Sequence, residues 1–270
     1  MASEADLKGM TALVTGGSSG IGLEFCRSLA QRGADILMVS IQEKELVESC
    51  REISETYGVR TYSLLVDLTE EDAAARIEEY IDAEGIEIGI LVNNAGIFSF
   101  NLLADTPSSK IVCFIDLHIR AVTSLSLRFA SRMKARGGGY ILNMSSMSCW
   151  MPMPGIAMYA STKAYIRVFS RALHYEMRDS GVKVTVACPG GIATDLFGLP
   201  EPLKRLAVRI GALQTPGKFA RNAVGKMLGG RSQYINGWLN RFSIFFIGIT
   251  PTPVRMMVKR LMLDRGIRRP

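Results

Sequence analysis

The sequence contains few of the residues that hold metals or form disulfide frameworks. Only two histidines occur among its 270 residues. Five cysteines are present, without CxxC spacing or histidine partners, and they are Cys26, Cys50, Cys113, Cys149 and Cys188. This pattern predicts reduced thiols that mostly pack in a core, and no metal site. No secretory leader is expected either, because Met1 to Lys8 is short and polar, so the expected location is the cytoplasm.

Long hydrophobic runs are also missing. The apolar run Phe242–Ile249 is far shorter than the ~18 residues of a transmembrane helix. Pro251 and Pro253 then interrupt the segment that follows. The sequence therefore predicts no transmembrane helix in this region.

Acidic residues are scarce toward the C-terminus. Residues 201–270 contain 14 Lys and Arg but only two acids, whereas residues 1–200 contain 18 Lys and Arg and 23 Asp and Glu. This basic stretch is either an ordinary solvated face or, with its apolar residues, a contact for an anionic membrane surface, an acidic partner or an amphiphilic substrate. It carries no nucleic-acid recognition motif, so nucleic-acid binding is not expected.

The rest of the chain alternates between strand and helix patterns. Nearly continuous apolar runs predict strands at Thr11–Thr15, Asp35–Ser40, Arg60–Val66, Ile88–Val92, Gly139–Met144 and Val182–Cys188, with a short seventh at Gln233–Ile235. Helical patterns occupy Gly20–Gln31, Glu43–Tyr57, Glu70–Glu84, Ser108–Lys134 and Ala157–Asp179. This order predicts a single α/β domain with a doubly wound parallel sheet and helices on both faces.

A glycine-rich turn follows the first predicted strand. The motif G-x-x-x-G-x-G consists of Gly16, Gly20 and Gly22, with Ser18, Ser19 and Ile21 between them. Gly16 permits a tight turn, Gly20 lets the backbone approach a pyrophosphate, and Gly22 allows the helix to pack on the sheet. The start of the helix then offers free N–H groups to phosphates. The turn predicts dinucleotide binding at this edge of the sheet.

A second motif points to proton transfer. Tyr159 and Lys163 are one helical turn apart, and Ser146 lies thirteen residues upstream. A cation about 4 Å from the phenol, at an effective dielectric near 20, stabilises the phenolate by about 4 kcal/mol. That energy lowers the pKa of Tyr159 by roughly three. Tyr159 is then the expected general acid or base, with Ser146 bonding the substrate oxygen.

Five motifs in order resemble the short-chain dehydrogenase/reductase family. They are TGGSSGIG at 15–22, NNAG at 93–96, a serine at 146, YASTK at 159–163 and PGGIATD at 189–195. The resemblance implies a seven-stranded Rossmann fold, NAD or NADP as cofactor, and assembly as homodimers or homotetramers. It also implies cofactor contacts by Ser40, Asp67, Leu68, Asn93, Ala95, Gly96, Lys163, Pro189, Gly190, Ile192 and Thr194. A helix-capping role for Asp67 or Thr69 is the alternative.

The chain departs from the family pattern at two places. The family's relay asparagine aligns with His118, which either relays protons in its place or is structural. At the end of the second strand, Ser40, Ile41 and Gln42 include neither the acid typical of NAD-preferring members nor the arginine typical of NADP-preferring ones. The resemblance slightly favours NADP.

The substrate is expected to be bulky and hydrophobic. Trp150, Met151, Met153 and Met158, with the apolar segment after Thr194, are either pocket walls or ordinary core. We expect residues 8–195 to form the dinucleotide-binding and catalytic core, 196–230 the substrate lid and helix, and 231–270 a basic and apolar extension. The predicted function is hydride transfer between a nicotinamide and a hydroxysteroid-like or long-chain acyl ketone. The alternatives are a 3-oxoacyl thioester reductase served by a carrier protein, and a non-catalytic dinucleotide sensor or scaffold.

Overall fold

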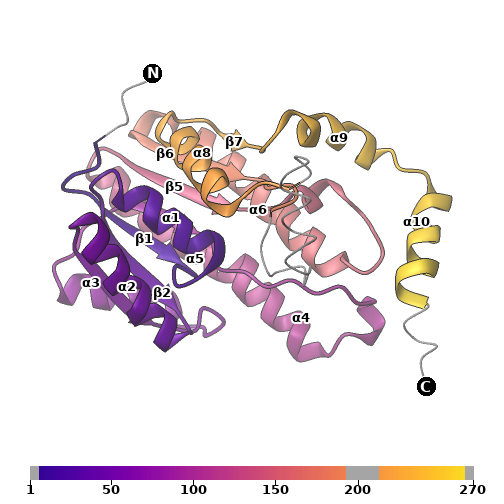
Figure 1. Cartoon of the computed structure of the whole chain (residues 1–270), viewed down its shortest axis with the longest axis horizontal. Coiled ribbons are helices and arrows are strands. Elements are labelled where there is room, and N and C mark those ends of the chain that lie inside the picture. Colours follow the sequence, from indigo (N-terminus) through magenta and orange to yellow (C-terminus); the bar gives the residue numbers. More distant parts are fainter. Residues whose placement is uncertain (1–5, 193–212, 265–270) are drawn as a thin grey trace.

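A seven-stranded parallel sheet forms the centre of the computed structural model, which describes residues 6–192 and 213–264. The strands are β1 (Thr11–Thr15), β2 (Asp35–Ser40), β3 (Thr61–Leu65), β4 (Ile88–Asn93), β5 (Gly139–Met144), β6 (Val182–Ala187) and β7 (Gln233–Tyr234). Their order across the sheet is β3-β2-β1-β4-β5-β6-β7, and every pairing is parallel (Figure 1). The predicted fold class is confirmed.

Helices cover both faces of this sheet. The helices that precede β5 in the chain are α1 (Gly20–Ala30), α2 (Glu43–Tyr57), α3 (Ala73–Ala83), α4 (Ser108–Ile115) and α5 (Ala121–Ala135). Those that follow are α6 (Ala157–Glu176), α8 (Pro216–Leu228), α9 (Trp238–Gly248) and α10 (Thr252–Val258). Two apolar cores result, one shared by α1, α2 and α8 and one by α3 and α5.

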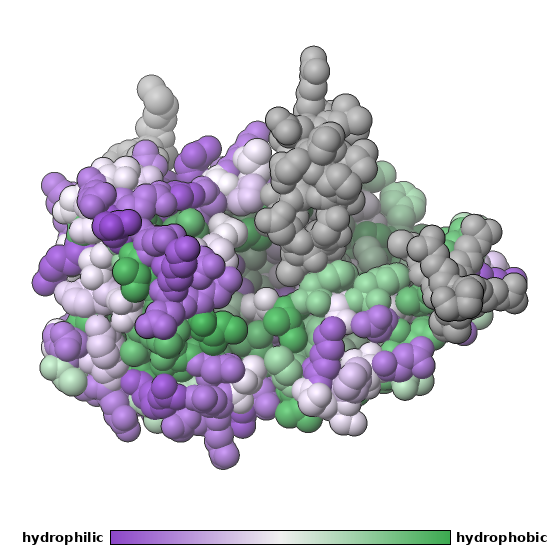
Figure 2. Space-filling model, turned by 60° about the horizontal axis from the view of Figure 1, so that its bottom comes forward, coloured by the Kyte–Doolittle hydropathy of each residue, from purple (hydrophilic) through white to green (hydrophobic). Residues whose placement is uncertain are grey.

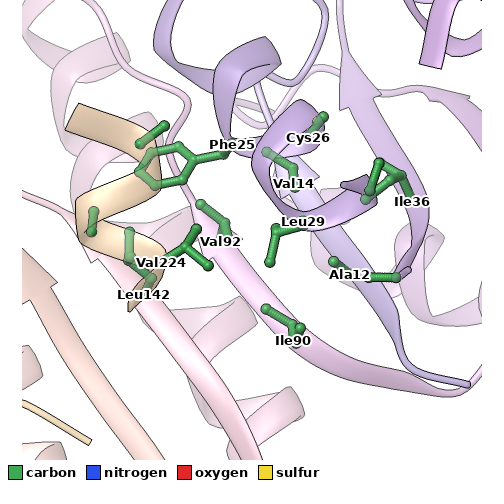
Figure 3. Packing of buried hydrophobic residues seen from close by; sticks show 14 of the residues in the cluster. Ala12, Val14, Phe25, Cys26, Leu29, Ile36, Ile90, Val92, Leu142 and Val224 are labelled. Carbon is green, nitrogen blue, oxygen red and sulfur yellow. The ribbon is translucent and has the colours of Figure 1, made fainter. Parts of the chain in front are cut away.

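The strands divide their side chains between these cores. In β1, Ala12 and Val14 belong to the core beneath α1 and α8, whereas Leu13 belongs to the opposite one. Figure 3 shows Phe25 and Leu29 of α1 gathered with Val224 of α8 over the strands. Because both faces of the central strands are buried, their sequences are apolar almost without interruption, as the prediction assumed. The edge strand β3 differs, since none of its residues is buried.

One predicted helix differs in detail. The segment predicted as Ser108–Lys134 is interrupted by a π turn (η2) at Asp116–Arg120, between α4 and α5. A π turn inserts one extra residue and changes the direction of the side chains around it. His118 lies within this turn and is completely buried.

The strand order reverses direction between β1 and β4. The chain runs outward through β2 and β3 on one side and through β5, β6 and β7 on the other. Ligands of doubly wound folds bind at such a reversal, beyond the carboxyl ends of the strands. The glycine turn after β1 and the loop at residues 94–96 after β4 meet at this point.

Candidate functional site

A cleft of about 610 Å³ lies at the carboxyl ends of the strands. Of the residues predicted to form the site, it is lined by Gly16, Ser19, Gly20, Ile21, Gly22, Ser40, Asp67, Leu68, Ala95, Gly96, Tyr159, Lys163 and Pro189. The cleft therefore joins the glycine turn at one end to Tyr159 and Lys163 at the other.

The glycine turn has the geometry that its sequence predicts. Gly16 and Gly20 have φ of 63° and 55°, a left-handed conformation that side chains disfavour. A Cβ on Gly22 would overlap the carbonyl oxygen of Gly16 and lie 2.6 Å from Nδ2 of Asn94. Only glycine at position 22 allows α1 to pack this closely against the turn.

The start of α1 is open toward the cleft. Its N-cap, Ser19, makes no side-chain capping bond, and the first turn contains no acidic residue. The first N–H groups of a helix have no partner within the helix and carry partial positive charge. These features fit a bound pyrophosphate, so the residues present suit a dinucleotide.

The turn is tied to the loop after β4 through Thr15 and Asn94. The Thr15 hydroxyl accepts the N–H groups of Asn94 and Ala95 at 3.0 and 3.1 Å. The Asn94 side chain donates to the Thr15 carbonyl at 3.1 Å. Sequence reasoning named the neighbouring Asn93 for the cofactor, but Asn93 is buried and donates to Asn143 Oδ1 at 2.8 Å. Asn94 lines the cleft.

Hydroxyl and amide groups gather at the end of β2. The Ser18 and Ser40 hydroxyls are 2.7 Å apart, and Ser18 and Ser19 both donate to Gln42 Oε1 at 3.2 Å. Gln42 lines the cleft, whereas Ser18 is buried behind it. With both hydroxyl bonds on its oxygen, the Gln42 amide keeps its nitrogen as a donor.

The Asp67 carboxylate stabilises the turn that follows β3. Its Oδ1 accepts the N–H and the hydroxyl of Thr69, both at 2.8 Å. The following helix, α3, begins at Ala73 with Asp72 as its N-cap, so neither Asp67 nor Thr69 caps it. The capping alternative is therefore wrong, and Asp67 lies on the cleft wall.

The catalytic candidates converge from β5 and α6. Ser146 follows β5, where its hydroxyl accepts the Ser148 N–H at 3.1 Å and also bonds the Tyr159 hydroxyl. Lys163 donates from Nζ to the Met144 carbonyl at 2.9 Å, and Nζ lies 5.8 Å from the centre of the Tyr159 ring. Ser145 donates to the Lys163 carbonyl at 2.7 Å, which fastens α6 to the end of β5.

The electrostatics of this pair differ from the prediction. Burial raises the pKa of Tyr159, although its bond with Ser146 acts in the opposite direction. Burial also lowers the pKa of Lys163 to about 8. The predicted lowering of the Tyr159 pKa by Lys163 is therefore wrong for this arrangement, because the ammonium donates to Met144 and both groups are desolvated.

His118 is held from both sides. The Ile97 N–H donates to Nε2 at 3.1 Å, and Nδ1 lies 2.9 Å from the Thr162 hydroxyl. Thr162 donates its own proton to the Tyr159 carbonyl at 3.1 Å. Nδ1 must therefore carry the imidazole proton and donate it to Thr162. With both nitrogens engaged by protein groups, the geometry favours the structural alternative for His118 over the proton relay.

The buried imidazole has a consequence for stability. Burial, followed by the charge of Lys163, lowers the pKa of His118 from 6.5 to about 2. The unfolded chain therefore binds one more proton than the folded chain between these values, and stability falls as the pH falls through this window. The expected loss is about 1.4 kcal/mol per pH unit.

Replacing His118 with asparagine, which does not titrate, should remove this loss. Urea unfolding of the parent and of His118→Asn at several pH values between 6.5 and 4.5 measures it. The difference in unfolding free energy between the two proteins should change by about 2.3 kcal/mol over that range, because the unfolded imidazole is already half protonated at pH 6.5. If the plots of unfolding free energy against pH are parallel for the two proteins, His118 is protonated in the folded protein.

The remaining predicted residues lie beside the cleft or outside the described part. Gly190 donates its N–H to Asn236 Oδ1 at 2.6 Å, and Ile192 is buried and bridges to Gln214. Thr194 falls outside the described residues. Sequence reasoning did not name eleven of the lining residues as site residues, namely Val39, Ile41, Gln42, Val66, Thr69, Asn94, Ile97, Cys113, Leu117, Met144 and Ser145. For residues directly after strand ends, such as Val66, Asn94 and Ser145, that position was the available signal, whereas Cys113 lies in α4 and Leu117 in the π turn.

The predicted substrate walls divide into two groups. Met151, Met153 and Met158 pack with Phe98 and Phe100 around the cluster that contains Tyr159, Phe114 and Ile156. The Phe98 and Tyr159 rings meet edge to face, with centroids 5.0 Å apart. Trp150 belongs to a different cluster. The guanidinium carbon of Arg167 lies over the Trp150 ring, 4.3 Å from its centre. The methionines, and not the tryptophan, adjoin the phenol.

Comparisons with known proteins agree with this geometry. Vertebrate relatives include proteins named very-long-chain 3-oxoacyl-CoA reductase. One from Danio rerio is 34% identical over 198 residues, which are 72% of this chain and 61% of that protein. One from Anas platyrhynchos is 33% identical over 254 residues, 92% of this chain and 78% of that protein. The chain thus spans between about three-fifths and four-fifths of the length of these relatives.

Two solved structures are similar along nearly the whole chain. A 7beta-hydroxysteroid dehydrogenase superposes with a TM-score of 0.80 at 26% identity, covering 97% of this chain and 96% of its own. A short-chain dehydrogenase from Sphingobium yanoikuyae in complex with NADPH gives 0.77 at 25% identity, covering 94% and 96%.

The family model described as short chain dehydrogenase matches residues 10–200. This range contains the glycine turn, the loop after β4, Ser146, Tyr159 and Lys163. The chain therefore belongs to the short-chain dehydrogenase family of Rossmann-fold oxidoreductases.

Proposed function

We propose that this chain interconverts a bulky hydrophobic ketone and its secondary alcohol, with NADP as the cofactor. The observation that carries the proposal is one cleft with two different ends. The glycine turn and the open start of α1 lie at one end, and Tyr159 with its apolar surroundings lies at the other. Such a cleft can hold a dinucleotide and present its nicotinamide to a substrate beside Tyr159.

The proposed mechanism uses the hydroxyls of Ser146 and Tyr159. NADPH supplies a hydride to the carbonyl carbon when it is bound. The Tyr159 hydroxyl donates its proton to the carbonyl oxygen, while Ser146 donates a hydrogen bond to the same oxygen. Because burial raises the pKa of Tyr159, the phenol keeps its proton at neutral pH, as ketone reduction requires. The Lys163 ammonium would bind the ribose of the nicotinamide nucleotide.

We assign His118 a positioning role in this mechanism. Its bonds join three segments: the loop at Ile97, the π turn, and α6 through Thr162. Its ring also meets the Tyr159 ring edge to face, with centroids 6.1 Å apart. The imidazole therefore fixes the phenol relative to the loop that lines the cleft.

The preference for NADP rests on the groups at the end of β2. Ser18, Ser40 and Gln42 include no carboxylate that would repel a 2′-phosphate, and the Gln42 amide nitrogen is available as a donor. The similar Sphingobium yanoikuyae enzyme was solved with NADPH. Both observations favour NADP over NAD.

The substrate class follows from the methionines and aromatic rings beside Tyr159. Unbranched methionine side chains adapt to irregular apolar ligands, and aromatic rings add apolar area. The names of the similar proteins support two ligands of this kind, a hydroxysteroid and a long-chain 3-oxoacyl thioester. We favour the ketone or secondary alcohol of a steroid or long acyl chain, and the 3-oxoacyl thioester is the second candidate.

A substrate panel tests this proposal. Steady-state rates would be measured with NADPH and with NADH on a steroid ketone, a long-chain 3-oxoacyl-CoA and a ketose sugar. We expect kcat/KM to be at least about 100-fold higher for a hydrophobic substrate than for the sugar, because each buried methylene adds to binding. Activity confined to the sugar would reject the proposal. Cofactor binding without turnover on any substrate would favour a sensor or scaffold.

Several coarser features complete the proposal. We propose one functional unit over residues 1–270, with a substrate lid and helix at residues 196–230, and assembly as a homodimer or homotetramer. The greater part of the expected lid, residues 196–212, lies outside the described residues. A cytoplasmic location, with peripheral contact to a membrane, is also part of the proposal.

A further inference from the structure

The helix α9 exposes its apolar side chains to solvent. No residue of this helix is buried, although seven of its eleven residues are large and hydrophobic or aromatic. Phe245 is 81% exposed and Trp238 is 78% exposed, and Phe242, Phe246 and Leu239 are exposed as well. Soluble proteins seldom expose a contiguous apolar patch of this kind unless it contacts another surface.

The next segment continues the same surface. In α10 and the turn that follows it, Val254, Met256, Met257 and Leu261 are all exposed. Figure 1 shows α9 and α10 extending from the body of the molecule beyond α6. In Figure 2, hydrophobic residues are more extensive toward this half, while hydrophilic residues prevail on the half that carries α2 and α3. We call residues 238–261 the C-terminal apolar surface.

All charged residues of this surface are positive. Arg241, Arg255, Lys259 and Arg260 occur between residues 238 and 261, and no Asp or Glu does. Arg241 and Arg255 use side-chain nitrogens to bond the carbonyls of Ile235 and Gly248, at 3.2 and 3.3 Å. The surface thus combines exposed aromatic rings with cationic side chains.

We propose that the C-terminal apolar surface seats this chain on an anionic lipid bilayer. Aromatic rings enter the boundary between headgroups and acyl chains, while Lys and Arg side chains reach the headgroup phosphates. A second copy of this chain is a poorer occupant. A two-fold contact would place the same cations against one another, whereas anionic lipid neutralises them.

The length of the helices restricts the contact to the interface. The eleven residues of α9 extend over roughly 16 Å, about half of the hydrocarbon thickness. Among the described residues, no helix has both the length and the apolar character needed to cross a bilayer. The surface therefore lies on the membrane and does not span it.

This surface adjoins the cleft. A Cβ on Gly190 would overlap the Asn240 amide of α9, and Gly190 follows Pro189 of the cleft wall. Leu263, two residues after the surface, is buried, and its Cδ1 lies 3.2 Å from the Cβ position of Gly155 in the segment leading to Tyr159. Docking would bring the substrate end of the cleft close to the bilayer, which suits the hydrophobic substrate of the proposed function.

Vesicle flotation with the full chain tests the docking. Vesicles of equal parts phosphatidylcholine and phosphatidylserine would be compared with pure phosphatidylcholine, at low and high salt. We expect recovery with the anionic vesicles, and weaker recovery at high salt or without phosphatidylserine. The double variant Trp238→Ser/Phe245→Ser should weaken binding at least tenfold. Arg255→Gln and Lys259→Gln should each weaken it about fivefold.

A matched control separates this surface from apolar exposure in general. Leu127 on α5 is 64% exposed, so Leu127→Ser removes a comparable side chain elsewhere and should leave vesicle binding unchanged. Absence of the parent chain from the lipid fraction, or equal binding by parent and double variant, would overturn the proposal. So would a dimer that the double variant abolishes, because a second copy would then cover the surface.

The test of lipid binding and the test of catalytic turnover can fail independently of each other. Turnover of a water-soluble ketone, measured without vesicles, should be the same in the parent and in the double variant, since neither substituted residue lines the cleft. Loss of lipid binding with intact turnover would leave the proposed function standing. Lipid binding without turnover on any substrate would leave the docking surface standing.

Discussion

Replacing Tyr159 with phenylalanine is expected to lower kcat for ketone reduction by about 100- to 10,000-fold, the usual contribution of a positioned general acid. The substitution removes only the hydroxyl, which is bonded to Ser146. The ring remains and keeps its edge-to-face contact with Phe98. Folding and cofactor affinity should therefore be nearly unchanged, and steady-state and single-turnover rates with NADPH measure the loss.

Tyr165→Phe is the matched control. Tyr165 lies on the same helix, and its hydroxyl bonds Thr123 at the exposed surface and not in the cleft. Its removal should change kcat by less than about twofold, because surface substitutions alter stability little. If Tyr159→Phe keeps more than about a tenth of the parent rate, the phenol is not the general acid and the proton must come from another group.

Replacing Gly22 with alanine is expected to cost more than about 3 kcal/mol of folding stability and to abolish tight cofactor binding. The added methyl group would overlap the Gly16 carbonyl oxygen and crowd Asn94 Nδ2. The oxygen belongs to the backbone of the turn, so no side-chain rotation relieves the overlap. Helix α1 must then move away from the turn, and its open N-terminus moves with it.

Gly225→Ala provides the opposite expectation. Gly225 lies within α8, is exposed, and has open space around its Cβ position. Alanine should stabilise the protein by up to about 1 kcal/mol, because it is the better helix former. Urea unfolding and titration with NADPH would be measured on both variants. An unfolding free energy for Gly22→Ala within about 1 kcal/mol of the parent would contradict the close packing of turn and helix.

The pKa of Tyr159 shows where reasoning from residue spacing reaches its limit. The spacing of Tyr159 and Lys163 predicts that they lie one helical turn apart, as they do. It does not reveal that Lys163 donates to Met144 or that Phe98 and Phe114 help to bury the phenol. Burial depends on residues about 40 to 60 positions away in the sequence, and it reverses the direction of the predicted pKa change.

The C-terminal residues show a similar limit. The composition of residues 201–270 predicts a basic and apolar surface, but no helix was predicted after residue 230. Both α9 and α10 are present. A helix without a buried face lacks the alternation of apolar and polar residues by which amphipathic helices are detected.

Local sequence alone determined the order of strands and helices as far as β6, the glycine turn and the pairing of Tyr159 with Lys163, because each depends on periodicity or on glycine conformation within a few residues. Tertiary structure decided which asparagine faces the cleft, which nitrogen of His118 carries the proton, and how burial shifts the pKa values of Tyr159 and Lys163. These properties arise where β4, β5, the π turn and α6 meet. Contacts between segments far apart in the chain leave no periodic pattern in the sequence of any one of them.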